Sequence, residues 1–284
     1  MSPPDFVTRF APSPTGYLHR GHAFSALTAF HAARDAGGRF CLRIEDIDAT
    51  RCRPEYETAI YEDLAWLGLA WEQPVRRQSQ HMADYGAALR DLSERGLIYR
   101  CFRTRREVAE AIERAPHGAM EAFRGAPLPP DEEARRVEAG EAYAWRLSLD
   151  AADRALGGFA HLTFDERGEG PGGERGTIQA RPELGGDVVL ARKDVGVAYH
   201  LAVVVDDALQ GVTEVIRGRD LFEATHVQRL LQALLALPTP GYRHHRLLAG
   251  PDGKRYAKRD RAQTLRELRA SGMTADELRG DLGF

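Results

Sequence analysis

The first part of the chain alternates between strand, turn, helix and strand patterns, and this order constrains the fold most. Residues 6–10, "FVTRF", alternate as a short strand does, and the prolines and glycine of "APSPTG" then interrupt the pattern. From Gly21 onward apolar residues recur at helical spacing until Gly37 and Gly38, and residues 39–46, "RFCLRIED", read as a second strand. Strand, helix and strand in this order predict adjacent parallel strands joined by a right-handed crossover.

The same stretch indicates where a ligand would bind. Open parallel sheets bind ligands at the carboxyl ends of their strands, where residues 11–22, "APSPTGYLHRGH", would lie. The turn leads into a helix N-terminus, whose free N–H groups and dipole attract phosphate. His19 and His22 could add imidazole donors that stabilise a phosphate gaining charge in a transition state. One alternative is that the two histidines bind a metal, but no carboxylate or cysteine stands at a spacing that would complete the site. The other is that they only cap the helix or face solvent.

Further along, the sequence predicts more helices and strands and two loose stretches. Helical spacing covers residues 54–67, 78–96 and 220–237, and strand patterns cover residues 97–101, 142–149, 187–193 and 213–218. Residues 199–207 are rich in β-formers, although residues 201–209 could also be helical. Thr104 and Glu107 form a capping box that opens a short helix. Glycine and proline make residues 116–130 and 157–176 loop-like.

These elements together predict an α/β fold split by an insertion. We expect residues 1–100 and 188–238 to form the two halves of one domain built on a parallel sheet. Residues 101–187 are expected to form an inserted α+β subdomain. Residues 239–284 then hold a turn, a basic cluster and two short helices.

Three charged residues stand at the ends of predicted strands. Arg9 closes the first strand, Glu45 closes the second, and Arg217 closes the strand in "TEVIRG". A guanidinium fork held at a sheet edge suits a carboxylate, and a carboxylate there could receive an ammonium group. Taken singly, each residue could equally form an ordinary structural ion pair. Together, two arginines and one glutamate match an anionic amino acid.

A second basic feature lies near the end of the chain. Residues 251–260, "PDGKRYAKRD", place a basic cluster after a Pro-Asp-Gly turn. A flexible basic loop is suited to neutralising a pyrophosphate leaving group. Alone, this basic run is weak support for a phosphate-binding loop, because most runs of charged residues are solvent-exposed surface.

The composition limits partners and compartment. The chain has 284 residues with 39 Lys and Arg against 42 Asp and Glu, and a net charge of −3 gives no global sign of an anionic partner. The N-terminus lacks a signal-peptide pattern and no run of about 18 apolar residues occurs, which predicts a cytoplasmic protein without a membrane partner. Three widely spaced cysteines without a C-x-x-C pair argue against a disulfide framework and a thiolate zinc site.

Four stretches together resemble one family. "TRFAPSPTGYLHRGHAFSAL", "LRIEDID", "YHLAVVVDDALQGVTEVIRGRDL" and "LLAGPDGKRYAKRD" are similar to the glutamyl-tRNA synthetases, class I enzymes with HIGH and KMSKS signatures, and most of all to the truncated glutamyl-Q tRNA(Asp) synthetases. The likeness covers most of residues 6–260. It implies a Rossmann-type nucleotide-binding fold with a short helical C-terminal stem. It also implies that His19 and His22 bind the phosphates of ATP rather than a metal ion.

The resemblance also implies roles for individual residues. The implied catalytic residues are His19, His22 and Lys258, and the implied ATP-binding residues are Pro12, Ser13, His19, Gly21, His22, Arg255 and Lys258. The implied glutamate-binding residues are Arg9, Ala11, Ser13, Glu45, Tyr199 and Arg217. The family's K-L-S-K-R loop aligns with residues 255–259, where Arg255 replaces a lysine and Ala257 a serine. These departures keep the charge but lose a hydroxyl, so they bear on the rate of activation.

The insertion departs from the family at its zinc site. Family members often hold zinc with a C-x-C pair, a tyrosine and a further cysteine, whereas this chain keeps Cys101 but has Arg103 in the second place. One thiolate cannot hold a structural zinc that normally has four ligands. We therefore expect no zinc, and ATP with Mg²⁺ as the only cofactors.

The resemblance implies a reaction and its acceptor. The chain ends soon after Lys258, where a full glutamyl-tRNA synthetase continues into helical domains that read the anticodon. The glutamyl-Q enzymes are similar to this core alone. They make glutamyl-adenylate from ATP and L-glutamate without bound tRNA and pass glutamate to queuosine in the anticodon loop of tRNA(Asp). A monomer is the family expectation.

Two other functions stay open at this stage. The first is a glutamate-activating ligase with a different acceptor, such as a small molecule or a carrier protein. The second is a non-catalytic paralogue that binds RNA or nucleotide, for which the altered loop at residues 255–259 is the only support.

Overall fold

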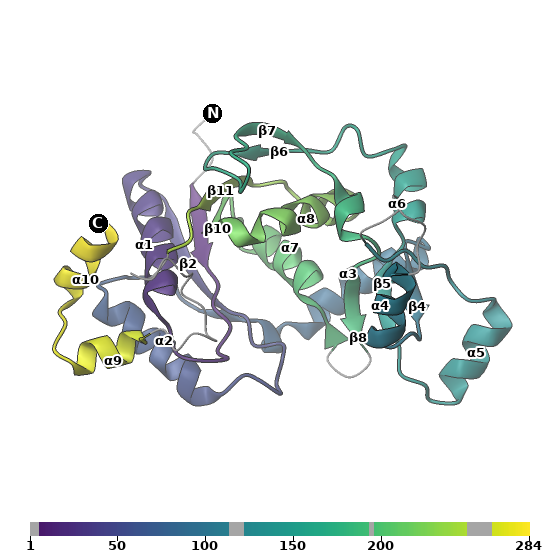
Figure 1. Cartoon of the computed structure of the whole chain (residues 1–284), viewed down its shortest axis with the longest axis horizontal. Helices are drawn as coiled ribbons and strands as arrows, with labels where there is room; N and C mark the ends of the chain where they lie inside the picture. The colour runs from purple at the N-terminus through teal and green to yellow at the C-terminus, as the bar shows by residue number, and fades with distance from the viewer. Residues whose placement is uncertain (1–5, 114–121, 193–195, 249–262) are drawn as a thin grey trace.

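The computed structural model describes residues 6–113, 122–192, 196–248 and 263–284. Parallel strands occupy its centre, and helices cover them (Figure 1). Arg255 and Lys258 lie outside the described residues. Within the described ranges no helix is long and apolar enough to cross a membrane.

The first sheet confirms the predicted strand, helix and strand unit. Its members are β1 (Val7–Phe10), β2 (Arg39–Ile44) and β3 (Arg76–Arg77), with α1 (Arg20–Asp35) between β1 and β2. The strands β1 and β2 pair in parallel, with Val7 opposite Arg39 and Phe10 opposite Leu42, and β3 pairs in parallel with β2. Helix α1 packs against both β1 and β2, as a crossover helix must.

A second group of parallel strands lies beside this sheet. The strands are β10 (Glu214–Gly218) and β11 (Gly241–His245), joined by α8 (Phe222–Leu234). Thr213, just before β10, donates its N–H to the Val7 carbonyl at 2.9 Å, and its Oγ1 accepts the Val7 N–H at 2.9 Å. Strands β1 and β10 therefore lie side by side. The strand order reverses between them, which is the position where open α/β sheets bind ligands.

Helices from both ends of the chain close one apolar core. The helices are α2 (Pro54–Trp66), α9 (Leu265–Ala270) and α10 (Ala275–Leu282), which pack beside α1 (Figure 1). Leu64 of α2, Leu268 of α9 and Leu278 of α10 are buried in the same cluster as Leu27 and Leu42. Thr264 and Thr274 each cap their helix with a capping box, so the two predicted C-terminal helices are confirmed.

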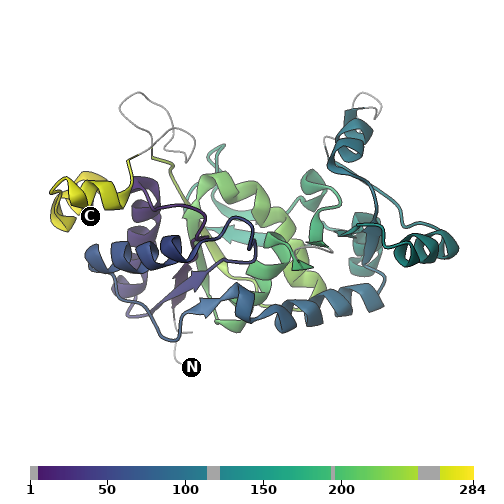
Figure 2. The same cartoon turned by 90° about the horizontal axis from the view of Figure 1, so that it is seen from below.

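An antiparallel sheet forms the other end of the molecule. Its strands are β4 (Ile98–Cys101), β5 (Ala144–Leu147), β8 (Val189–Arg192) and β9 (Gly196–Val197), in that spatial order. The helices α4 (Arg105–Glu113), α5 (Pro130–Glu138) and α6 (Leu149–Leu156) accompany it, and α3 (Met82–Glu94) runs toward it from the parallel sheet (Figure 2). The Thr104 and Glu107 capping box is present at the start of α4.

The prediction of a loose loop at residues 157–176 is partly wrong. This stretch contains β6 (Thr163–Glu166), and β7 begins at its end (Gly176–Gln179). The hairpin pairs with β11 through Glu166 and Tyr242, so it joins the sheet of β10 and β11 rather than the insertion's own sheet. Alternate residues of β6, Phe164 and Glu166, are buried. An alternating pattern of only four residues, with glycines on both sides, is too short to distinguish a strand from a loop.

The stretch expected to be β-rich at residues 199–207 is a helix. Helix α7 (Tyr199–Leu209) packs against α3 and α8, and residues 201–207 are all buried. Burial on every side removes the polar face that marks an amphipathic helix, so periodicity alone could not separate a helix from a buried strand. The helical alternative raised for residues 201–209 is correct.

Candidate functional site

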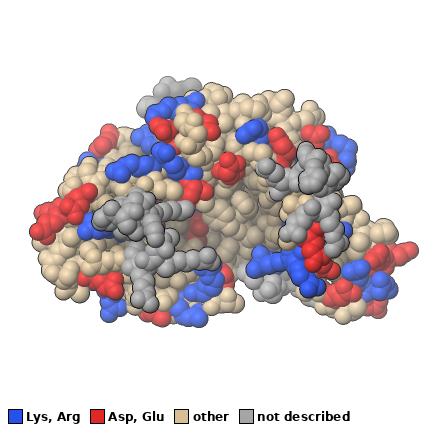
Figure 3. Space-filling view, in the orientation of Figure 1, with Lys and Arg blue, Asp and Glu red and all other residues tan. Residues whose placement is uncertain are grey.

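A cavity of about 650 Å³ lies at the carboxyl ends of β1 and β10. Its walls include ten of the residues named from the sequence, namely Arg9, Ala11, Pro12, Ser13, His19, Gly21, His22, Glu45, Tyr199 and Arg217. In the space-filling view a recess opens near the middle of the molecule (Figure 3). The structure thus brings together every described residue of the predicted ATP and glutamate sites.

The two histidines form the entrance to α1. His19 is the N-cap, and its Nδ1 accepts the N–H of Gly21 at 3.1 Å. The Nδ1 of His22 accepts the N–H of His19 at 3.2 Å, and the two ring centroids are 3.8 Å apart. Because each Nδ1 is an acceptor, a neutral ring carries its proton on Nε2. Both histidines can therefore donate through Nε2 while their other nitrogen stabilises the helix end.

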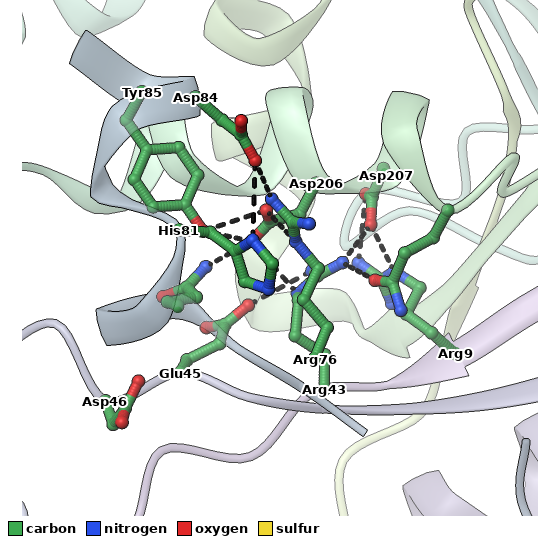
Figure 4. A network of polar contacts seen from close by, with 12 residues as sticks. Arg9, Arg43, Glu45, Asp46, Arg76, His81, Asp84, Tyr85, Asp206 and Asp207 are labelled. Atoms are coloured by element: carbon green, nitrogen blue, oxygen red, sulfur yellow. Dashed lines mark hydrogen bonds and ion pairs between the residues drawn. The ribbon is translucent and has the colours of Figure 1, made fainter. Parts of the chain in front are cut away.

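Buried charges hold Arg9 in place at the end of β1. The Nε of Arg9 lies 2.9 Å from Oδ1 of Asp207, which belongs to α7. The same Oδ1 accepts from Nη1 of Arg43 at 2.7 Å, and Nη2 of Arg43 lies 3.2 Å from Oε1 of Glu45. Nε of Arg43 also lies 3.6 Å from Asp206 (Figure 4). The fully buried Arg43 thus contacts Glu45 directly and is linked to Arg9 through Asp207. It connects two of the three charged residues predicted to bind an amino acid.

This network sets the protonation of its carboxylates. Burial would raise the pKa of Asp207, but Arg9 and Arg43 hold that pKa below its ordinary value. Burial also raises the pKa of Glu45, and Arg43 and Arg9 only partly oppose this. An ammonium group entering the cavity beside Glu45 would favour its ionised form.

Arg217 faces the cavity with neutral partners. Its Nε donates to Nε2 of His244 at 3.2 Å, its Nη2 donates to Oγ1 of Thr225 at 2.7 Å, and its Nη1 lies 3.5 Å from the hydroxyl of Tyr199. The ring of Tyr242 lies under the guanidinium, 5.5 Å from its carbon. Among the described residues no carboxylate pairs with Arg217, although the side chain is buried. Its charge is thus available for an anionic ligand.

Several buried polar residues that support the site were not predicted from the sequence. They are Arg43, Glu166, Asp206, Asp207, Thr225 and His244. Two adjacent aspartates inside the apolar run "LAVVVDDAL", and an arginine inside the strand "CLRI", were signals, because a buried charge needs a partner. Which partner each would find could not be read from the sequence.

The described residues that flank the other predicted ATP-binding residues in the sequence lie beside the cavity. Leu248, the last described residue before them, lines the cavity. After them, Thr264 forms a β-bridge with His19, and Leu265 donates its N–H to the Leu18 carbonyl at 2.8 Å. Residues 249–262, with Arg255 and Lys258, come between Leu248 and Thr264 in the sequence and are outside the described residues.

The donor set of the cavity suits phosphate rather than a protein-bound metal. In the described part of the chain no group of three or more His, Cys, Asp and Glu side chains is arranged to hold a metal ion. Cys101 is buried with a free thiol in β4. The absence of zinc from the insertion stays a prediction.

Comparison with known proteins identifies related chains. Residues 5–278 match the family "tRNA synthetases class I (E and Q), catalytic domain". The glutamyl-Q tRNA(Asp) synthetase of Rhodobacter capsulatus is 47% identical, over 98% of this chain and 100% of its own length. The protein of that name from Nocardia farcinica is 42% identical, over 95% of this chain and 81% of its own.

Solved structures show the same fold in longer proteins. A glutamate tRNA ligase from Elizabethkingia meningosepticum, in complex with its amino acid, superimposes with a TM-score of 0.74 and 28% identity. The match covers 90% of this chain and 52% of that one, so this chain spans about half the length of the solved relative.

Proposed function

The chain belongs to the class I tRNA synthetase family (E and Q) and is a ligase, and on this basis we propose that it activates L-glutamate with ATP and transfers it to queuosine in the anticodon loop of tRNA(Asp). Activation would not require bound tRNA. The acceptor rests on the glutamyl-Q tRNA(Asp) synthetases that match nearly the whole chain. The proposed cofactors are ATP and Mg²⁺.

One observation carries the choice of amino acid. The cavity holds an arginine without a carboxylate partner among the described residues, Arg217, and a carboxylate whose pKa burial raises, Glu45. Glutamate offers a side-chain carboxylate for the first and an ammonium group for the second. Glutamine would leave the buried guanidinium without an anionic partner, which costs about 2–5 kcal/mol in comparable buried pairs.

In the activation step the α-carboxylate of glutamate attacks the α-phosphorus of ATP. A carboxylate oxygen forms the new bond to phosphorus, the bond to the β-phosphate oxygen breaks, and pyrophosphate leaves. The side chains supply no covalent nucleophile, so they act by position and charge. His19 and His22 would donate Nε2–H to phosphate oxygens at the N-terminus of α1, and Lys258 and Arg255 would neutralise the pyrophosphate.

Mg²⁺ fits this cavity as a companion of ATP. The donors at the entrance to α1 are N–H groups of His19, His22 and the backbone, which suit phosphate oxygens and not a cation. Mg²⁺ is commonly held mainly by substrate phosphates and water. When bound in this way it supplies further charge neutralisation to the phosphates.

In the transfer step a hydroxyl of the queuosine cyclopentene ring attacks the glutamyl carbonyl carbon. An ester bond forms, the hydroxyl proton is released, the bond to the adenylate phosphate oxygen breaks, and AMP leaves.

A test of the first step needs no tRNA. Purified protein with ATP, Mg²⁺ and labelled pyrophosphate should exchange label into ATP with L-glutamate and far less with L-glutamine or L-aspartate. Lack of exchange with glutamate in the absence of tRNA would contradict the proposal.

A further inference from the structure

Three buried side chains form a line that ends at the cavity. Nε of Arg217 donates to Nε2 of His244 at 3.2 Å, and Nδ1 of His244 lies 2.5 Å from Oε2 of Glu166. Arg217 is 5% exposed, and His244 and Glu166 are each 2% exposed. None of these contacts is local in sequence, because the residues come from β10, β11 and β6. The line therefore depends on how the β6 hairpin docks on β11.

The backbone fixes the carboxylate of Glu166. Its Oε1 accepts the N–H of His244 at 2.9 Å and the N–H of Gly168 at 2.8 Å. Gly168 lies so close to β11 that a Cβ atom there would be 2.3 Å from the His244 carbonyl oxygen, which explains a glycine at this position. With Oε1 occupied by two backbone donors, Oε2 remains for the ring of His244.

The surroundings determine which nitrogen of His244 carries the proton. Burial lowers the pKa of His244 and favours the neutral ring, although Glu166 opposes this. Burial would raise the pKa of Glu166, but the hydrogen bonds from His244 and Gly168 hold it below its ordinary value. An ionised carboxylate can only accept and an arginine N–H can only donate. The neutral ring must therefore carry its proton on Nδ1 and accept from Arg217 through Nε2.

We propose that Glu166 and His244 are positioning residues that set the affinity for glutamate by orienting the guanidinium of Arg217. His244 and Thr225 occupy the edge of the guanidinium formed by Nε and Nη2. The edge formed by Nη1 and Nη2 is then left as the fork for a carboxylate, with the Tyr199 hydroxyl 3.5 Å from Nη1. This inference rests on the proposed activation of glutamate.

The variant Glu166→Gln tests the tautomer that this arrangement requires. Its amide oxygen can keep both backbone hydrogen bonds, which leaves the amide N–H₂ group facing Nδ1 of His244. The ring must then accept through Nδ1 and place its proton on Nε2, against the N–H of Arg217. We expect the KM for glutamate to rise about tenfold or more with little change in kcat, because binding to Arg217 is weakened equally in ground and transition states.

Two variants of His244 separate orientation from packing. In His244→Gln the amide oxygen can reach the position of Nε2 and still accept from Arg217. In His244→Asn the amide can still donate to Glu166, but nothing accepts from Nε of Arg217. We expect the glutamine variant to keep a KM for glutamate near that of the wild type and the asparagine variant to raise it about tenfold or more. Equal KM values in the two variants would overturn the proposal.

Glu214→Gln provides the matched control. Glu214 is also a buried carboxylate and lies on β10, but it pairs with Arg167 at 2.6 Å and Arg243 at 2.7 Å rather than with Arg217. The control should lower the unfolding temperature without changing the KM for glutamate. A KM that rises equally in Glu214→Gln and Glu166→Gln would show a general loss of structure and overturn the proposed role of Glu166.

The readout separates this inference from the proposed function. Pyrophosphate exchange with glutamate by the wild type must come first, and its absence would remove both. Exchange by the wild type together with unchanged KM values in Glu166→Gln and His244→Asn would overturn only the positioning role.

Heteronuclear NMR of the His244 ring gives a second, activity-independent measure. We expect the Nδ1–H form in the wild type and the Nε2–H form in Glu166→Gln, and an Nε2–H wild type would contradict the proposal.

Discussion

Asp207 holds Arg9 across 198 positions of sequence, with Oδ1 2.9 Å from Nε and both side chains buried. The same carboxylate accepts from Arg43, which in turn pairs with Glu45. Helix α7, whose sequence is rich in β-formers, therefore fixes two charged residues of the cavity wall, Arg9 directly and Glu45 through Arg43.

Replacing Asp207 should damage both stability and substrate binding. In Asp207→Asn the buried Arg9 loses its anionic partner and Arg43 keeps only Glu45 and Asp206. Breaking a comparable buried pair costs about 3–5 kcal/mol. We expect chemical denaturation to show a loss of this order and exchange assays to show a raised KM for glutamate. Asp281→Asn is the control, because Asp281 forms a half-exposed pair with Arg20. An Asp207→Asn variant as stable as Asp281→Asn would contradict the account.

The two roles of His19 can be separated by substitution. Asparagine is a good N-cap, so His19→Asn should keep the start of α1 but remove the donor at Nε2. We expect an unchanged unfolding temperature and a kcat for adenylate formation lowered about 100-fold, as for the loss of one transition-state donor. His19→Ala should lose activity and stability together. A fully active His19→Asn would mean that the imidazole does not contact phosphate.

Arg217 should be required for activation but not for folding. Arg217→Ala removes the only group in the described cavity that we assign to the glutamate side chain, so glutamate-dependent exchange should fall below detection. Arg217→Lys should not restore it, because an ammonium cannot hold His244 and Thr225 while presenting a fork. Circular dichroism checks the fold. Exchange retained in Arg217→Ala would remove this residue from the pocket.

Asp63, which does not line the cavity, makes the free energy of unfolding depend on pH. Its carboxyl group is fully buried on α2 and accepts no hydrogen bond from the described residues, and burial raises its pKa to about 6 against the partial opposition of Arg269. The folded state thus binds this proton more tightly than the unfolded state, so stability from this group is gained as pH falls through about 6.

The variant Asp63→Asn should therefore be more stable than the wild type at pH about 8, where the buried carboxylate is ionised. The difference should shrink as the pH falls through about 6 and vanish below the ordinary pKa of an aspartate, near 4. Thermal unfolding of both proteins across this range measures it. A difference that is independent of pH would show that Asp63 does not titrate in this range.

The sequence predicted the parts of the fold that depend on local patterns. Strand β1, helix α1 and strand β2 each carry their own periodicity, and Pro12 and Gly37 follow soon after β1 and α1. Their order alone placed Arg9 and Glu45 at the same edge of a sheet, because parallel strands end together. The cavity residues described above follow from that edge and from the family resemblance.

The parts that were missed depend on long-range packing. Residues 201–207 of helix α7 are all buried, so this part of the sequence shows no polar face. Strand β6 has four residues and takes its place by pairing with β7 and, through Glu166 opposite Tyr242, with β11. The contacts of Asp207 with Arg43 and of Glu166 with His244 depend on these placements, so no local pattern could have paired them.

The acceptor is the central claim, and one measurement tests it directly. Purified protein, ATP, Mg²⁺ and labelled glutamate are incubated with total tRNA from cells that make queuosine and from cells that cannot. The account predicts label on tRNA(Asp) from the first source and none from the second. Label on tRNA(Glu), equal label from both sources, or no label despite exchange with glutamate would contradict it.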